Sequence, residues 1–317
     1  MNWIKKGLIF QPGEQYSWLV SHAQCPNPLE LKDRLRIYFS SRRRQENDGM
    51  WVARGFFLDV AKEDPSQLLH IHDRPILELG AAGEFDHFGI MPGSVVPVGD
   101  KLYLYYCGWD RGVAVPYHWA IGLAVSKDGG ETFQRCGKGP ILGPTHREPY
   151  LQACPVVKRE GGKWHMWYLS GLRWLEAGGR KESVYQLMHA TSHDGIDWER
   201  EGEPIIPAQV EDECQTSAAL MEAGDRHLML FSYRYGSDFR NRRRGYRIGC
   251  AHSMDLRYWQ RDDTLAGLEP SAAGWDSEMI CYPSICTVGS KTYLFYCGND
   301  FGRGGFGYAE LAETGAD

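Results

Sequence analysis

The chain has 317 residues, of which 43% are hydrophobic, so it can bury a sizeable core as two ordinary domains or as one large all-β domain. Its net charge of −6 and pI of about 6.0 exclude the overall basic field that binds nucleic acid or anionic lipid. The sequence shows no signal-peptide pattern and no run of about 18 apolar residues, so we expect a soluble, cytosolic protein with no membrane or nucleic-acid partner.

The nine cysteines are an odd number, form no Cys-x-x-Cys pair and lie mostly in apolar runs. This pattern is typical of buried free thiols in a reducing compartment, not of a disulfide framework or a metal site. We therefore expect no catalytic metal and no cofactor.

A hairpin signature occurs five times along the chain. Each copy has an extended apolar run, a turn with Gly, Asp or Lys, and an aromatic-rich run, as in "MPGSVVPVGDKLYLYYCGWD" at 91–110. Corresponding positions are separated by 66, 63, 63 and 65 residues, which is close to one fifth of the chain. The anchor residues are Pro26, Pro92, Pro155, Ala218 and Pro283.

A third strand-like run follows in each unit and ends in a Ser-x-Asp turn, most clearly at "SKDGGETF", "SHDGIDW" and "SMDLRYW". A short motif comes next, at "DRPILEL" (73–79), "KGPILGP" (138–144) and "GEPIIPA" (202–208), and we interpret it as a fourth strand. Four short strands repeated at a fixed period predict a β-propeller.

The last unit ends at "GGFGYAEL" after three strands, and "KKGLIF" at 5–10 can supply its fourth. We therefore predict a single all-β domain over 1–317, a propeller of five blades with four antiparallel strands each. The N-terminal strand completes the last blade and closes the ring, which removes an exposed strand edge.

Acidic residues lie at matching offsets before four of the five anchors. In a propeller, residues that precede the first strand of a blade and those that follow its second strand should line one mouth of the central channel. Four blades place an acid six or seven residues before the anchor, where the first blade has Leu19 and Val20. The acids are Asp86, Glu148, Glu211 with Asp212, and Asp276, while Glu213 and Glu278 stand five residues before their anchors.

We take Asp86, Glu148 and Glu213 as catalytic candidates. The same rim gathers cations and aromatic rings, and the alternative for each acid is that it caps a turn. The substrate-binding candidates are His22, Arg42, Trp109, Asp110, Arg147, Asp212, Arg234, Asp276, Glu278 and Tyr282.

Acids that converge on one cavity repel one another, a cost that is usually tolerated for function. Carboxylates bond sugar hydroxyls and transfer protons, aromatic rings stack on pyranoses, and cleavage of a glycosidic bond requires such acids. The sequence thus predicts an enzyme that cleaves or transfers a glycosidic bond at a central pocket, with a small-molecule or oligosaccharide substrate.

The sequence resembles the five-bladed propeller superfamily of glycoside hydrolases and phosphorylases, which includes arabinanases, invertases, levansucrases and β-mannoside phosphorylases. The resemblance covers essentially the whole chain. It rests on "FDHFGIMPGSVV" (85–96), "REPYLQACPVV" (147–157), "WDSEMICYPSI" (275–285) and the Ala-x-Ser-x-Asp turns that begin at Ala124, Ala190 and Ala251.

The resemblance implies that Asp86 matches the Asp that tunes pKa and binds substrate, and that Glu148 matches the general acid. The first-blade Asp of the hydrolases is absent. The phosphorylases need only one protein acid, because inorganic phosphate is the nucleophile. His22, Arg42, Arg147 and Arg234 would then hold the phosphate.

Three alternatives stay open. One is a non-catalytic glycan-binding propeller that lacks the first-blade acid, and another is a purely scaffolding propeller. The third is a sialidase, because "SKDGGETF" fits the Asp-box turn, although sialidases have six blades. The arginines at 42–44 and 240–244 either favour an anionic substrate or are solvated loop charges.

Overall fold

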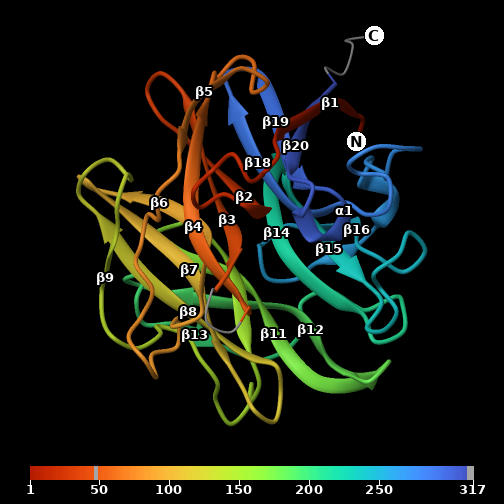
Figure 1. Cartoon of the computed structure of the whole chain (residues 1–317). Helices are drawn as coiled ribbons and strands as arrows, with labels where there is room; N and C mark the ends of the chain where they lie inside the picture. Colours follow the sequence, from red (N-terminus) through yellow and green to blue (C-terminus); the bar gives the residue numbers. More distant parts are fainter. Residues whose placement is uncertain (46–48, 313–317) are drawn as a thin grey trace.

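The computed structural model describes residues 1–45 and 49–312 and shows an all-β chain (Figure 1). Helical structure in these residues is confined to one 3-10 turn, η1 (Asp263–Leu265), and one short α-helix, α1 (Asn299–Gly302). No helix in this part of the chain has the length and apolar character that crossing a membrane requires.

Three of the sheets have four antiparallel strands each. In two of them the strands follow one another across the sheet in chain order, and in the third the N-terminal strand occupies the last edge. The first consists of β10 (Gln152–Glu160), β11 (Lys163–Ala177), β12 (Arg180–Ser192) and β13 (Glu199–Arg200), the second of β14 (Cys214–Ala223), β15 (Arg226–Arg234), β16 (Arg247–Ser253) and β17 (Gln260–Arg261), and the third of β18 (Cys281–Val288), β19 (Lys291–Cys297), β20 (Phe306–Leu311) and β1 (Trp3–Phe10).

A fourth sheet contains two further units of four strands. A single parallel bridge between Ala53 and Gly89 joins them, so the two units are otherwise separate antiparallel ladders. One unit comprises β2 (Ser21–Glu30), β3 (Leu35–Arg44), β4 (Trp51–Val60) and β5 (Leu68–His72), and the other β6 (Gly89–Val98), β7 (Lys101–Arg111), β8 (Tyr117–Ser126) and β9 (Gln134–Arg135).

The two ends of the described chain meet in one sheet. Strand β1 pairs antiparallel with β20, with Leu8 opposite Gly307 and Phe10 opposite Phe306. Figure 1 shows the red N-terminal strand beside the blue C-terminal strands. This is the pairing predicted for "KKGLIF", and it gives β20 a hydrogen-bonded neighbour on each side.

The prediction that the "PIL" motif forms the fourth strand is wrong. The outermost strands β9, β13 and β17 are two-residue pairs that come before the motif, and β5 likewise precedes "DRPILEL". The motifs instead bury aliphatic side chains, namely Ile76 with Leu77 in the first, Leu142 in the second and Ile206 in the third, at 1–4% exposure. After the proline, which lacks the N–H that a ladder needs, the motif keeps only isolated backbone bonds to the third strand, such as the bridge between Leu142 and Ile121, and it forms no regular strand.

The hydrophobic core is divided into clusters that lie between successive units. Tyr105 of β7 packs with Trp164 and Tyr168 of β11, and Phe39 of β3 packs with Phe295 of β19. The first strands also touch one another, since the Val157 N–H donates to Ser94 Oγ at 2.8 Å. Each sheet therefore buries both faces against its neighbours, which explains the nearly continuous apolar runs in the sequence.

The three clear Ser-x-Asp turns have the geometry that the sequence predicts. Asp128, Asp194 and Asp255 each accept backbone N–H groups three or four residues later, at 2.9–3.1 Å. These bonds fix the turn between the third strand and the short outer strand.

Candidate functional site

The carboxylate of Asp86 is fully buried inside its own unit. Its Oδ2 accepts a hydrogen bond from the hydroxyl of Tyr106, twenty residues later, at 2.9 Å. It also accepts from Arg135 Nε at 2.8 Å, and Arg135 belongs to the outermost strand, β9. We call this arrangement an acid clasp: a buried acid, a tyrosine twenty residues later, and a cation on the last strand of the sheet.

The acid clasp occurs again in two other units. Glu148 accepts from the Tyr168 hydroxyl at 3.0 Å and pairs with Arg200 of β13 at 3.5 Å. In the sheet that joins the chain ends, Asp276 accepts from the Tyr296 hydroxyl at 3.0 Å and from Lys5 Nζ of β1 at 2.6 Å.. Both acids are at most 3% exposed.

Glu213 shows a variant of the same clasp. Its Oε1 pairs with Arg261 Nη1 of β17 at 2.6 Å and accepts from Gln215 Nε2 at 2.7 Å. Its Oε2 accepts the backbone N–H groups of Gln209 and Val210 at 2.9 and 3.1 Å. Every oxygen of this carboxylate is therefore already bonded within the protein.

The unit that lacks the acid also lacks the tyrosine. Leu19 stands at the offset of the acid and Phe39, twenty residues later, at that of the tyrosine, and both are fully buried. Because acid and hydroxyl are replaced together, this unit fills the same place with apolar side chains. The missing first-blade acid is thus explained by packing.

The structure does not bring Asp86, Glu148, Glu213 and Asp276 together in one cavity, as the sequence analysis expected. Each side chain turns toward the outermost strand of its own sheet, whereas the first strands are the ones that face each other. The reason is a cation on the last strand of each of these sheets. In three sheets this cation, Arg135, Arg200 or Arg261, ends an aromatic-x-Arg triplet that follows the Ser-x-Asp turn, a repeat that the sequence analysis did not use. The turn-capping alternative was closer to the observed role.

Two arginines from the predicted set, Arg42 and Arg234, lie among aromatic side chains. Arg234 is 4% exposed, donates to the Tyr185 hydroxyl at 3.1 Å, and lies 3.5 Å from the ring centre of Phe239. The Tyr185 and Tyr246 hydroxyls are hydrogen-bonded to each other. Tyr246 in turn lies 5.6 Å from Tyr282, ring centre to ring centre.

Arg42 approaches the same tyrosines from β3. Its guanidinium lies 5.4 Å from the Trp109 ring centre. Burial lowers the pKa of Arg42, whereas the neighbouring Tyr282, Cys25 and Tyr117 raise it. Burial raises the pKa of Tyr117, whereas its hydrogen bond with Ser183 and the charge of Arg234 lower it. Tyr117 is thus within the electrostatic influence of both cations.

We call these residues the arginine–tyrosine cluster. Among residues 1–45 and 49–312, neither of its arginines forms an ion pair with a carboxylate. A buried guanidinium without a counter-charge costs free energy, which an anionic ligand would recover. The cluster consists of Arg42, Tyr117, Tyr185, Arg234, Tyr246 and Tyr282.

His22 lies beside Arg42. Burial, together with the charges of Arg42 and Arg303, lowers the pKa of His22 to about 3. Its Nδ1 is hydrogen-bonded to the Ser21 hydroxyl at 2.9 Å, and its ring meets the edge of Trp51. A neutral imidazole next to two cations can share a ligand without adding to their repulsion.

The backbone is bent at the same place in four first strands. Cys25, Cys154, Ser217 and Tyr282 have positive φ angles of 50–55°, and the strand register shifts at each of them. They line a narrow cavity of about 20 Å³ between the first strands. Non-glycine residues at positive φ are strained, and such bulges aim side chains at functional sites.

The remaining candidates lie at the edge of this region or in solvent. Trp109 and Asp110 are half-buried on β7, Asp212 is paired with Arg173, and Arg147 and Glu278 are exposed. Sequence reasoning missed Tyr117, Tyr185 and Tyr246. For Tyr185 and Tyr246 a signal was present, since each stands five residues before a repeated Ala, as Trp119 does in its own unit, but Tyr117 does not share this offset.

One group within the described residues has the composition of a metal site. Ligand atoms of Glu160, Glu222 and His227 lie within 4.8 Å of one another. Lys158 Nζ, however, is bonded to both carboxylates at 2.6 Å. The ammonium group already supplies the positive charge there, so we assign this group to surface ion pairing.

No protein-family model matches the chain. The uncharacterized protein MT1551 of Mycobacterium tuberculosis (strain CDC 1551 / Oshkosh) is 36% identical over 312 residues, which cover 98% of this chain and 99% of that protein. The chain belongs to the family of this mycobacterial protein. A 1,2-beta-oligomannan phosphorylase of Thermoanaerobacter sp. (strain X514) is 27% identical over 241 residues, or 74% of this chain and 73% of the phosphorylase.

Solved structures share the fold over nearly the whole chain. One, described as a glycoside hydrolase, has a TM-score of 0.76 at 17% identity and covers 99% of this chain and 93% of its own. Another, from work on the GH130 family of mannoside phosphorylases, has a TM-score of 0.66 at 13% identity and covers 98% and 94%. The resemblance to glycoside hydrolase and phosphorylase propellers is therefore confirmed.

Proposed function

We propose that the chain is a carbohydrate-active enzyme that cleaves or transfers a glycosidic bond, and that its active site is the arginine–tyrosine cluster. The observation that carries the proposal is that Arg234, buried beside Tyr185, and Arg42, half-buried against Trp109, both lack a carboxylate partner in the described chain. The fold and the similarity to an oligomannan phosphorylase agree with it.

The fold that we propose around this site is a five-bladed propeller closed by β1. The pairing of β1 with β20 supports it, as does the core cluster that joins β3 with β19. In such a ring the first strands surround the axis, and the cluster lies where those strands begin.

The chemistry that the cluster favours is phosphorolysis. Two guanidiniums and a neutral imidazole suit inorganic phosphate, which arginine binds through paired N–H donors. A phosphate oxygen would attack the anomeric carbon while the glycosidic C–O bond breaks and the leaving oxygen takes a proton. The products are a sugar 1-phosphate and a shortened glycan.

The proton donor of that step is best sought at the edge of the cluster. Asp86, Glu148 and Glu213 are at most 3% exposed and are bonded within their clasps. The charge of Glu182 acts on Tyr117. Glu182 pairs with Arg240 and Asp212 with Arg173, but these two arginines are 46% and 54% exposed, so water weakens both pairs, unlike those of the clasps. We propose one of these two acids, Glu182 or Asp212, as the proton donor.

A panel of β-1,2-mannobiose and other disaccharides, assayed with and without phosphate, tests the proposal. We expect turnover only with phosphate and a sugar 1-phosphate in the ³¹P NMR spectrum. Arg42→Gln should abolish it, whereas Arg257→Gln, at an exposed arginine paired with Glu201, should not. Equal turnover without phosphate, or full activity in Arg42→Gln, contradicts the proposal.

One observation favours a second candidate, a non-catalytic glycan-binding propeller. All three acids that the sequence analysis took as catalytic are bonded within their own units. If this candidate is correct, calorimetry will show sugar binding that Arg42→Gln weakens, and no product will form from any member of the panel.

A further inference from the structure

The narrow cavity between the first strands contains thiols that the proposed reaction does not use. Its volume is about 20 Å³, and three free cysteines line it, namely Cys25, Cys107 and Cys154. A volume of this size admits one molecule about as large as water. Cys25 of β2 and Cys154 of β10 are the positive-φ residues of their strands, so the bulges aim these two thiols at the same space.

Cys25 and Cys154 interact with each other, although they belong to different units. The Cys25 thiol donates a hydrogen bond to the Cys154 sulfur, which is the largest cause that lowers the pKa of Cys154. Burial opposes this shift, and hydrogen bonds from the Thr216 and Ser217 hydroxyls lower the pKa as well. The same bond is the largest cause that raises the pKa of Cys25 well above its ordinary value. The pair is therefore asymmetric, with Cys154 favoured as the thiolate and Cys25 as the thiol.

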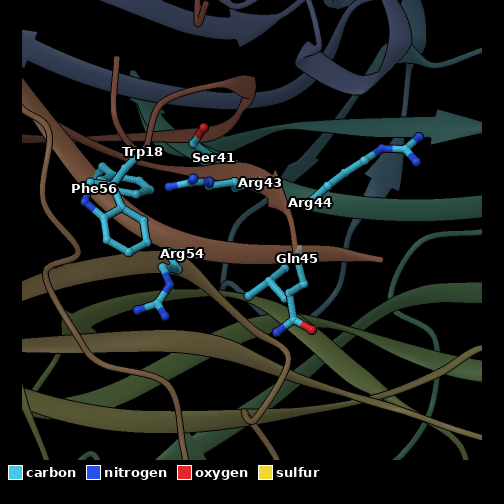
Figure 2. Close-up of a pocket in the computed structure, with 8 residues that line it drawn as sticks. Trp18, Ser41, Arg43, Arg44, Gln45, Arg54 and Phe56 are labelled. Atoms are coloured by element: carbon cyan, nitrogen blue, oxygen red, sulfur yellow. The ribbon is translucent and has the colours of Figure 1, made fainter. Parts of the chain in front are cut away.

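The surroundings of the pair are those of a reactive thiol, which are partly exposed and positively charged. Cys154 is partly exposed, whereas Cys25 is 9% exposed. The nearby cation is Arg42, which interacts electrostatically with Cys25. Side chains alternate along β3, so Arg42 lies on the opposite face from Arg43, which Figure 2 shows extending toward Trp18.

We propose that Cys154 reacts with hydrogen peroxide, and not with bulky disulfides, and then forms a disulfide bond with Cys25. The Cys154 thiolate attacks one peroxide oxygen, the O–O bond breaks, and Cys154 sulfenic acid and hydroxide form. The Cys25 sulfur then attacks the Cys154 sulfur, so that the S–S bond forms, the S–O bond breaks and water leaves with the proton of Cys25. In sum, two thiols lose two electrons and two protons, and one peroxide becomes two molecules of water.

The size of the cavity is what selects the oxidant. Hydrogen peroxide is little larger than water, whereas glutathione disulfide is many times larger and cannot enter a space of about 20 Å³. The new bond ties β2 to β10 beside Tyr282, a member of the arginine–tyrosine cluster that also lines the cavity. The proposal stands whether or not the chain is an enzyme.

Peptide mapping without reduction tests this modification. Folded wild-type protein is treated with hydrogen peroxide or with glutathione disulfide, the remaining thiols are blocked in denaturant, and the digest is analysed by mass spectrometry. We expect peroxide, and not glutathione disulfide, to produce a linked pair of peptides that contain Cys25 and Cys154, and dithiothreitol to separate them. The control thiol is Cys136, which is exposed and should be oxidised about tenfold more slowly or less, because the thiolate is the form that attacks peroxide.

Two variants separate the roles of the pair. In Cys25→Ser the sulfenic acid of Cys154 should persist and be trapped by dimedone, whereas in Cys154→Ser the Cys25 thiol should stay reduced. Circular dichroism checks that both variants fold, and the wild-type map decides the question if they do not.

Three results would overturn the proposal. Cys136 is oxidised while Cys25 and Cys154 stay reduced, which shows that the pair is inert. Cys154 becomes a sulfinic acid, or is linked to Cys107, and no link to Cys25 appears. Glutathione disulfide produces the linked pair as fast as peroxide does, which contradicts selection of the oxidant by size.

Discussion

The acid clasp predicts that Asp86→Asn damages stability and not catalysis. The amide keeps the shape but removes the charge, so Arg135, whose side chain is 19% exposed, loses its counter-ion. Breaking a buried ion pair costs about 3–5 kcal/mol. Because Arg135 can turn partly toward water, we expect the lower end, about 3 kcal/mol.

Urea unfolding followed by circular dichroism measures this loss, and kcat per folded molecule is measured at low temperature in parallel. The matched control is Asp33→Asn. Asp33 also pairs with an arginine, Arg34, at 3.0 Å, but it is 70% exposed, so the change should be below about 1 kcal/mol. Adding Arg135→Gln to Asp86→Asn should cost less than the sum of the two single changes.

The reasoning is refuted if Asp86→Asn unfolds at the wild-type urea concentration while turnover disappears. That pair of results would assign Asp86 to the reaction, as the sequence resemblance implied, and the clasp would contribute nothing measurable.

Four further outcomes are expected. Lys5→Met should lower the free energy of unfolding by about 3 kcal/mol, because its partner Asp276 is buried. The control Lys6→Met, whose partner Glu310 is 26% exposed, should lower it by less than about 1 kcal/mol in the same urea titration. Equal effects of the two changes would contradict the clasp. The triple change Asp86→Leu, Tyr106→Phe and Arg135→Met gives this unit the apolar pair that Leu19 and Phe39 form in the first unit. It should be nearly as stable as the wild type in the urea titration, unlike Asp86→Asn. A triple variant as unstable as Asp86→Asn would show that apolar side chains cannot replace the clasp. Burial is the largest cause that lowers the pKa of His22 to about 3 and that of His189 to about 4, so below pH 6.5, the ordinary pKa of histidine, the unfolded chain binds more protons than the folded one. The contribution of these histidines to stability should therefore be constant above pH 6.5 and fall toward pH 4. The same fall in a variant with both His22→Gln and His189→Gln would show that the histidines do not cause it. Glu182→Gln or Asp212→Asn should abolish turnover with phosphate binding retained, and full activity in both would remove the proposed proton donors.

The repeat could be predicted because it is written in local residue types. Aromatic-rich hairpins, Ser-x-Asp turns and the N-terminal strand all appear in the structure where the sequence placed them. The outer strands could not be located, because two-residue strands such as Gln134–Arg135 carry no periodicity. The "PIL" motif was conspicuous for the separate reason that its aliphatic residue is buried.

The site was predicted only in part. Arg42, Arg234 and Tyr282 were selected by their position relative to the anchors, and Tyr246 lies beside both Arg234 and Tyr282. The acids were placed wrongly, because the offset fixes where a side chain begins but not which partner it turns toward. Those partners are Arg135, Arg200, Arg261 and Lys5, and Lys5 stands some 270 residues away from Asp276.

The most direct test of the account is calorimetric titration of inorganic phosphate into four proteins: wild type, Arg42→Gln, Arg234→Gln and Asp86→Asn. The account predicts one phosphate site in the wild type and in folded Asp86→Asn, and none in the two arginine variants. Phosphate binding that survives in both arginine variants but disappears in Asp86→Asn would contradict it.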